Sequence, residues 1–332
     1  MTRYWNKSEN KDARSAFGSI GRTIQANTLG VDCVTLTKKD KDTLAFFAFA
    51  SPWLIGFLLL TLIPMIASLY ISFTDWDILT PPNWIGLENY RSMLADPLFY
   101  RSVSVTLTYT VIGVPLHLCV SLILSLLLNN NLPGIKLFRT VFYLPAVISG
   151  ITVAVVWVWI FNPDFGIING FLRSVGIEGP RWIFDEFWAL PSIFIMTLWS
   201  VGGNMVIYLA ALQNVPTEQY EAAKVDGARW WARFWNITIP GISNVLLFTL
   251  LTGIIAALQI FTPALVMTSG GPNNATLFFA FHIYRNAFVF QRMGLACALA
   301  WVLFLIIFVV SAICIRITRG MVHYESDEGG IL

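Results

Sequence analysis

Charged residues are scarce in this chain. Asp, Glu, Lys and Arg make up only 12% of its 332 residues, whereas 56% are hydrophobic. Soluble domains carry about a quarter charged residues, so this composition excludes an ordinary soluble domain and favours an integral membrane protein. The formal net charge of +2 is too small to indicate binding to nucleic acid.

Several chemical motifs are missing. The chain has four cysteines, with no close pair and no metal-ligand spacing: Cys33, Cys119, Cys297 and Cys314. This pattern predicts inert thiols and no metal site. No stretch fits a phosphate-binding loop, a serine nucleophile elbow or a zinc-protease motif. We therefore predict that the chain is not an enzyme and holds no cofactor, so any ATP that drives it binds to another polypeptide.

Six apolar segments are long enough to cross a hydrocarbon core of about 30 Å as helices. They lie near residues 45–73, 103–128, 141–161, 190–212, 242–267 and 293–315. We predict an all-α integral membrane protein in which residues 43–317 form the transmembrane domain. A flexible tail (1–42) precedes that domain and a second tail (318–332) follows it.

Lys and Arg are unevenly distributed between the predicted spans. If the N-terminus is inside, the inner segments hold 15 of these residues and the outer segments hold 6. The positive-inside rule then predicts that both tails are cytoplasmic. The loop between the fourth and fifth spans lies on the same side.

The predicted spans contain no Asp, Glu, Lys or Arg in their interiors. Proton relays usually need such groups, which disfavours a proton-driven transporter but leaves sodium coupling through carbonyl and hydroxyl groups open. His117 is the titratable exception, and a neutral, hydrogen-bonded histidine is favoured there over a relay. A secondary transporter remains the weaker alternative, because the two halves show no convincing repeat.

Residues 218–240, EQYEAAKVDGARWWARFWNITIP, form the most distinctive polar stretch. Helix formers precede Gly227, where a positive φ would permit a sharp turn. A second helix should begin near Ala228 and end at Pro240. Its tryptophans and arginines suit a membrane boundary, so a plain interfacial connector is the alternative interpretation.

This stretch resembles the EAA loop of permease subunits in binding-protein-dependent ABC importers. The residues that carry the resemblance are Glu221, Ala222, Ala223, Asp226, Gly227, Ala228, Phe234 and Pro240. In that family the loop docks on the ATPase.

Further loop motifs resemble those of the sugar-type permeases of carbohydrate uptake family 1. They are Trp84 to Tyr90 (WIGLENY), Asp96-Pro97, Phe161-Asn162-Pro163, Gly166 to Asn169 and Gly270-Gly271-Pro272. In order along the chain, they extend the resemblance over residues 45–317.

The resemblance implies a type I ABC importer permease in the bacterial cytoplasmic (inner) membrane. Implied partners are a second homologous permease in a heterodimer, two ATPase subunits that bind ATP and Mg²⁺, an extracytoplasmic solute-binding protein, and membrane lipid. The implied cargo is a sugar or oligosaccharide. A permease for an amino acid or a polyol phosphate is the alternative.

Aromatic and neutral polar residues near mid-membrane suit a carbohydrate path, because hydroxyl groups need hydrogen bonds and sugar rings stack on aromatic faces. The candidates are Trp199, Ser200, Gly203, Asn204, Gln259 and Phe261. The register of maltose-type permeases adds Met196, Ala256, Ala257 and Ile260, whose side chains differ from the polar ones of those relatives. Helix packing is the alternative role for each residue.

Overall fold

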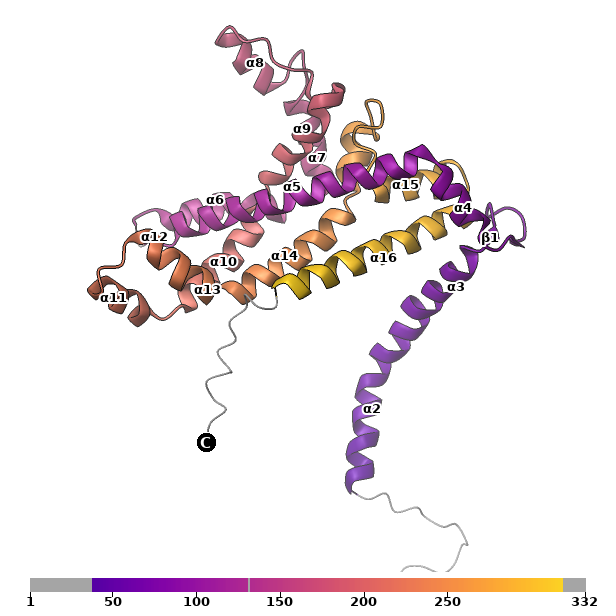
Figure 1. Cartoon of the computed structure of the whole chain (residues 1–332), viewed down its shortest axis with the longest axis horizontal. Helices are drawn as coiled ribbons and strands as arrows, with labels where there is room; N and C mark the ends of the chain where they lie inside the picture. Colours follow the sequence, from indigo (N-terminus) through magenta and orange to yellow (C-terminus); the bar gives the residue numbers. More distant parts are fainter. Residues whose placement is uncertain (1–37, 131, 319–332) are drawn as a thin grey trace, which may run out of the picture. The chain divides into compact units, whose positions relative to one another are not determined.

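The computed structural model describes residues 38–130 and 132–318, and nearly all of its regular structure is helical (Figure 1). Most of both predicted tails, including Cys33, lies outside the described residues. The chain divides into two compact units at residues 63 and 64. Within the first unit, α2 (Lys38–Phe57) leads into the π-helix η1 (Leu58–Leu62).

The second unit holds the other elements, apart from Ile63 at the start of α3. In chain order they are α3 (Ile63–Ile71), β1 (Thr74–Asp75), β2 (Asn83–Trp84), α4 (Glu88–Ala95), α5 (Pro97–Leu128), α6 (Ile135–Val147), α7 (Gly150–Ile160), α8 (Ile167–Ser174), η2 (Trp182–Phe184), α9 (Glu186–Leu198), α10 (Gly202–Asn214), α11 (Thr217–Val225), α12 (Trp230–Arg233), η3 (Phe234–Thr238), α13 (Ile239–Gly241), α14 (Ser243–Leu258), η4 (Ala264–Thr268), α15 (Phe279–Tyr284), η5 (Arg285–Val289) and α16 (Met293–Thr318). The strands β1 and β2 pair antiparallel.

Three helical segments of the described chain are long and apolar enough to cross a membrane: Ala45–Ile71, Pro97–Leu128 and Met293–Thr318. They lie close to the first, second and sixth predicted spans. Three bent helix pairs raise the possible number to six if each pair is one span. The bends are 101° between α6 and α7, 46° between α9 and α10, and 68° before α14.

The third, fourth and fifth predicted spans are interrupted, and the break in the fifth lies at Gln259, apart from the 68° bend at Ile242. Each contains a break with the same local bond, in which an amide donates to the carbonyl three residues earlier. The bonds run from Ile148 to Pro145 (3.3 Å), from Trp199 to Met196 (3.2 Å) and from Gln259 to Ala256 (3.3 Å). Such tight turns end an α-helix and leave backbone polar groups without helical partners.

Tertiary contacts hold the break between α9 and α10 in place. Gly202 lies so close to α6 that a Cβ built on it would be 2.1 Å from the Phe142 carbonyl oxygen. From α5, the Ser121 hydroxyl donates to the Val201 carbonyl at 3.2 Å and satisfies one acceptor in the break. These contacts come from distant parts of the sequence, so hydrophobicity along the span could not reveal the break.

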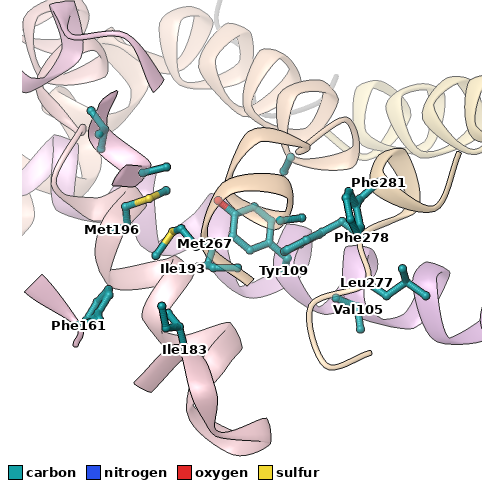
Figure 2. Close-up of a cluster of buried hydrophobic side chains, with 14 of the residues drawn as sticks. Val105, Tyr109, Phe161, Ile183, Ile193, Met196, Met267, Leu277, Phe278 and Phe281 are labelled. Atoms are coloured by element: carbon teal, nitrogen blue, oxygen red, sulfur yellow. The ribbon is translucent and has the colours of Figure 1, made fainter. Parts of the chain in front are cut away.

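The main hydrophobic core packs α5 against α9 and the segments after α14 (Figure 2). Tyr109 lies among Ile193, Met196 and Met267 in this cluster, and its ring meets Phe278 edge-on with centroids 5.3 Å apart. The helices α5, α10 and α14 pack against one another throughout this unit. The core thus positions the helix breaks side by side.

The WIGLENY stretch holds the end of α3 against α4. The buried Asn89 amide nitrogen donates to the carbonyls of Ser72 (2.9 Å) and Thr74 (2.8 Å), and the Tyr90 hydroxyl pairs with that of Ser72 at 2.8 Å. Gly86 has a φ of +63°, which suits glycine. In this chain the stretch therefore has a structural role.

Asn89→Ala should lower the thermal stability of the purified protein by about 1–3 kcal/mol, because two buried carbonyls lose their donor. Glu88→Gln is the matched control, since Glu88 is exposed and contacts Arg91 at 3.9 Å. Its effect should be below about 1 kcal/mol. Melting curves in detergent test the pair, and identical midpoints would contradict the assigned role of Asn89.

Candidate functional site

A cavity of about 590 Å³ lies where the three helix breaks meet, and we call it the break pocket. Its walls come from α5, from the α6–α7 and α9–α10 breaks, and from the end of α14 with the residues that follow. The acceptors of the three tight turns, Pro145, Met196 and Ala256, all line it. Irregular backbone at membrane depth is tolerated where it lines a water-filled cavity or is buried in protein, so the breaks and the pocket belong together.

The polar side chains of the break pocket are hydroxyls, an amide and an imidazole. They belong to Tyr109, His117, Thr197, Ser200, Asn204, Thr252 and Thr262. Among the described residues that line this pocket, none is Asp, Glu, Lys or Arg. The pocket therefore offers hydrogen-bond donors and acceptors together with one aromatic ring, an arrangement that suits a hydroxylated solute.

The structure brings only some of the predicted path residues into the break pocket. Ser200, Asn204, Ala256 and Ile260 line it, together with Met196 and Ala257. The other four predicted residues, Trp199, Gly203, Gln259 and Phe261, are not among its lining residues.

The helix breaks explain why these four residues lie outside the pocket lining, because each break changes the direction in which the neighbouring side chains point. Trp199 is 41% exposed and packs edge-on against Trp157 with centroids 6.1 Å apart. Phe261 packs against Phe281 and Tyr284. Gln259 is exposed, and Gly203 lies beside Ala146.

The pocket also contains residues that sequence reasoning did not propose for the path. On α5, Tyr109, Gly113 and His117 follow one another at intervals of four residues and line the pocket together. Residues four apart lie on one face of a helix. This spacing is a signal that could have identified the α5 wall.

The loop after α10 forms a second candidate site. As predicted, it contains two short helices that meet at Gly227, whose φ is +74°. The amides of Gly227 and Ala228 donate to the carbonyls of Lys224 (3.1 Å) and Ala223 (2.8 Å), which is the Schellman arrangement at the end of α11. Glu221, Ala222 and Asp226 are exposed. Ala223, Ala228 and Phe234 are half-buried.

The second helix ends one residue beyond the predicted end at Pro240. The second helix runs from α12 through the π-helix η3 and α13 as far as Gly241, and the chain bends at Ile242. A proline lacks an N–H donor, and the wider π turn immediately before Pro240 changes the hydrogen-bond spacing and accommodates it.

Contacts missed by the sequence analysis fix α11 to the spans. The Tyr220 hydroxyl pairs with that of Thr238 at 3.0 Å. Tyr220 also packs against a small core of Leu212, Val215 and Ile242. This core joins the loop to the end of α10 and the start of α14, two helices that also line the break pocket.

Comparisons with known proteins agree with this architecture. Residues 118–322 match a family described as the binding-protein-dependent transport system inner membrane component. YesP of Bacillus subtilis (strain 168), a probable ABC transporter permease protein, is 42% identical over 293 residues, which cover 87% of this chain and 94% of YesP. AmyD of Thermoanaerobacterium thermosulfurigenes, a probable permease for starch degradation products, is 32% identical over 280 residues, covering 84% and 95%.

The fold also matches a solved structure. A chain in the crystal structure of a bacterial alginate ABC transporter, in complex with a periplasmic protein bound to an alginate pentasaccharide, superposes with a TM-score of 0.76 at 23% identity. The superposition covers 86% of this chain and 97% of that chain. The likeness shows a shared fold.

Proposed function

The chain belongs to the family of binding-protein-dependent transport system inner membrane components, and on this premise we propose that it is the permease subunit of an ATP-driven importer for a sugar or oligosaccharide. The family match confirms the resemblance carried by the EAA loop, and it disfavours a secondary transporter. A relative that serves starch degradation products and a structural neighbour from an alginate transporter support a carbohydrate cargo over an amino acid or polyol phosphate.

The observation that carries the proposal is the break pocket. Many secondary transporters place their substrate sites where interrupted helices meet near the middle of the membrane, and we infer the same principle for this permease. In this chain the breaks that follow α6, α9 and α14 converge on one cavity lined by hydroxyl and amide groups. Such a lining replaces the water around a polyol without placing a charge in lipid.

The proposed membrane arrangement has six spans within residues 43–317, with both tails in the cytoplasm and the protein in the bacterial cytoplasmic (inner) membrane. A solute-binding protein delivers the cargo from outside, as the periplasmic partner in the alginate transporter complex supports. A second, homologous permease completes the path. Two separate ATPase subunits bind ATP and Mg²⁺, so this chain contributes no cofactor site.

The loop at 218–240 is the proposed contact with those ATPases. The small side chain of Ala222 is exposed on α11 and permits close approach, while the exposed Glu221 is available to a basic residue of the partner. Movement of α11 passes through the Tyr220–Thr238 contact and the core around Val215 to α10 and α14. ATP-driven closure of the ATPase subunits would then tilt α10 and α14, which form two walls of the break pocket.

A paired substitution in α14 tests the proposed path. Ala256→Trp places an indole in the break pocket, whereas Ile255→Trp enlarges the neighbouring residue, which is 37% exposed and does not line the pocket. We expect Ala256→Trp to lower ATP-driven saccharide uptake about tenfold or more, equivalent to about 1.4 kcal/mol of lost interaction. Ile255→Trp should transport normally.

The measurement is uptake of a panel of radiolabelled mono- and oligosaccharides by the assembled complex in proteoliposomes. ATPase copurification establishes that each variant assembles. Full uptake by Ala256→Trp would place the path elsewhere. Wild-type uptake of amino acids but of no saccharide would overturn the carbohydrate assignment.

A further inference from the structure

A second hollow, which we call the Arg101 groove, lies beside the break pocket and has a volume of about 730 Å³. Arg101, Ser104 and Thr108 of α5 line it, opposite Glu186, Phe187 and Phe194 of α9. Along α9 the groove residues come before those of the break pocket. Along α5 the two linings overlap, since the groove extends to Ile112 and the break pocket begins at Tyr109.

Two stacked rings lie at the boundary between these cavities. Tyr109 lines the break pocket and Phe194 lines the Arg101 groove, and their rings are parallel within 2° with centroids 5.2 Å apart. Phe278 supports Tyr109 from the side (Figure 2). Gly113 leaves room for Phe194, because a Cβ there would lie 3.0 Å from the phenylalanine ring.

We propose that the stacked pair of Tyr109 and Phe194 is a gate that separates the Arg101 groove from the break pocket along one solute path. This inference rests on the proposed function, in which the N-terminal ends of α5 and α9 face the outside. A saccharide would reach the groove first and enter the break pocket when the two rings part. The exposed ring faces then offer a stacking surface to each passing sugar ring.

The attachment of α9 permits this movement. At its C-terminal end α9 stops at the 46° bend before α10, so α9 is a helical segment separate from α10. Near its N-terminal end Glu186 contacts Arg101 at 3.5 Å and accepts a hydrogen bond from Asn273 at 3.1 Å. Both charged side chains are about half exposed, so their ion pair is weak and readily broken.

Removing one ring should open the path without ATP. The assay is liposome swelling with the neutral polyol xylitol, using the complete transporter complex reconstituted without nucleotide. We expect Phe194→Ala to raise xylitol influx about two- to tenfold. The closed conformation loses one stacked aromatic pair, and the stabilisation that such a pair provides corresponds to a factor of this size. Phe171→Ala removes an exposed ring of α8 that lines neither cavity, and it should leave influx at the wild-type rate.

Phe194→Leu provides a second variant that preserves apolar volume, in case the alanine variant does not assemble. Influx at the wild-type rate in an assembled Phe194→Ala or Phe194→Leu complex would overturn the gate. ATP-driven saccharide uptake is measured in the same vesicles. If Phe194→Ala raises xylitol influx but the wild-type complex takes up no saccharide, the proposed function is refuted and the gate is still supported.

Discussion

Gly202→Ala is expected to lower the stability of the folded protein by about 3 kcal/mol or more, at or beyond the upper end of the usual cost of overpacking. The added Cβ would lie 2.1 Å from the Phe142 carbonyl oxygen and 2.7 Å from the Tyr143 Cα. These atoms are backbone, so no side chain can rotate away. The start of α10 must instead move off α6, which displaces two walls of the break pocket.

The neighbouring Gly203 provides a matched control. A Cβ at Gly203 would meet only the Ala146 Cβ, at 3.9 Å, an ordinary contact distance. Gly203→Ala should be neutral or should stabilise the protein by up to about 1 kcal/mol, because glycine is unfavourable inside a helix. Thermal unfolding in detergent and the yield of assembled complex compare the two variants. Equal midpoints would show that α10 does not depend on this close approach.

Gly227→Val should uncouple ATP hydrolysis from uptake while leaving the spans inserted. The φ of +74° at Gly227 is unfavourable for a β-branched residue by about 1–3 kcal/mol. A Cβ at this position meets no atom within 4 Å, so the expected effect is conformational and not a clash. The turn would relax toward negative φ, and α11 would change its angle to α12.

Gly134→Val introduces the same kind of strain elsewhere, in the connection between α5 and α6. Gly134 has a φ of +85°, and a Cβ there also meets no atom within 4 Å. Gly134→Val should retain coupling, and Gly227→Asn should retain part of it because asparagine tolerates this conformation. ATP-driven uptake and ATPase copurification are measured for all three. Wild-type coupling in an inserted Gly227→Val protein would rule out a rigid lever at this turn.

Local chemistry explains the predictions that succeeded. A long apolar run needs no distant partner to form a helix in lipid, so the second and sixth spans end at or within a few residues of their predicted C-terminal limits. The turn at Gly227 depends on the conformational freedom of one residue and was equally predictable. The helix end was predicted to within one residue, because a proline restricts the backbone locally.

The residues that line the break pocket were harder to predict for a geometric reason. Helical periodicity assigns faces correctly only while a helix continues, and each break changes the direction of the side chains around it. Ser200 and Asn204 therefore line the break pocket while Trp199 and Gln259 do not. Tyr109 and His117 were accessible to periodicity, because α5 is continuous along the pocket.

By itself the sequence determined that this chain is a membrane protein with apolar helices, and its loop motifs identified the family, because composition and short-range conformational preferences act within one segment. Only the tertiary structure decided where three spans break and which side chains meet in a cavity. Those features depend on contacts such as Gly202 against Phe142 and Ser121 with Val201, between segments some 60 to 80 positions apart in the sequence. Packing across such separations has no signature in any single stretch of the chain.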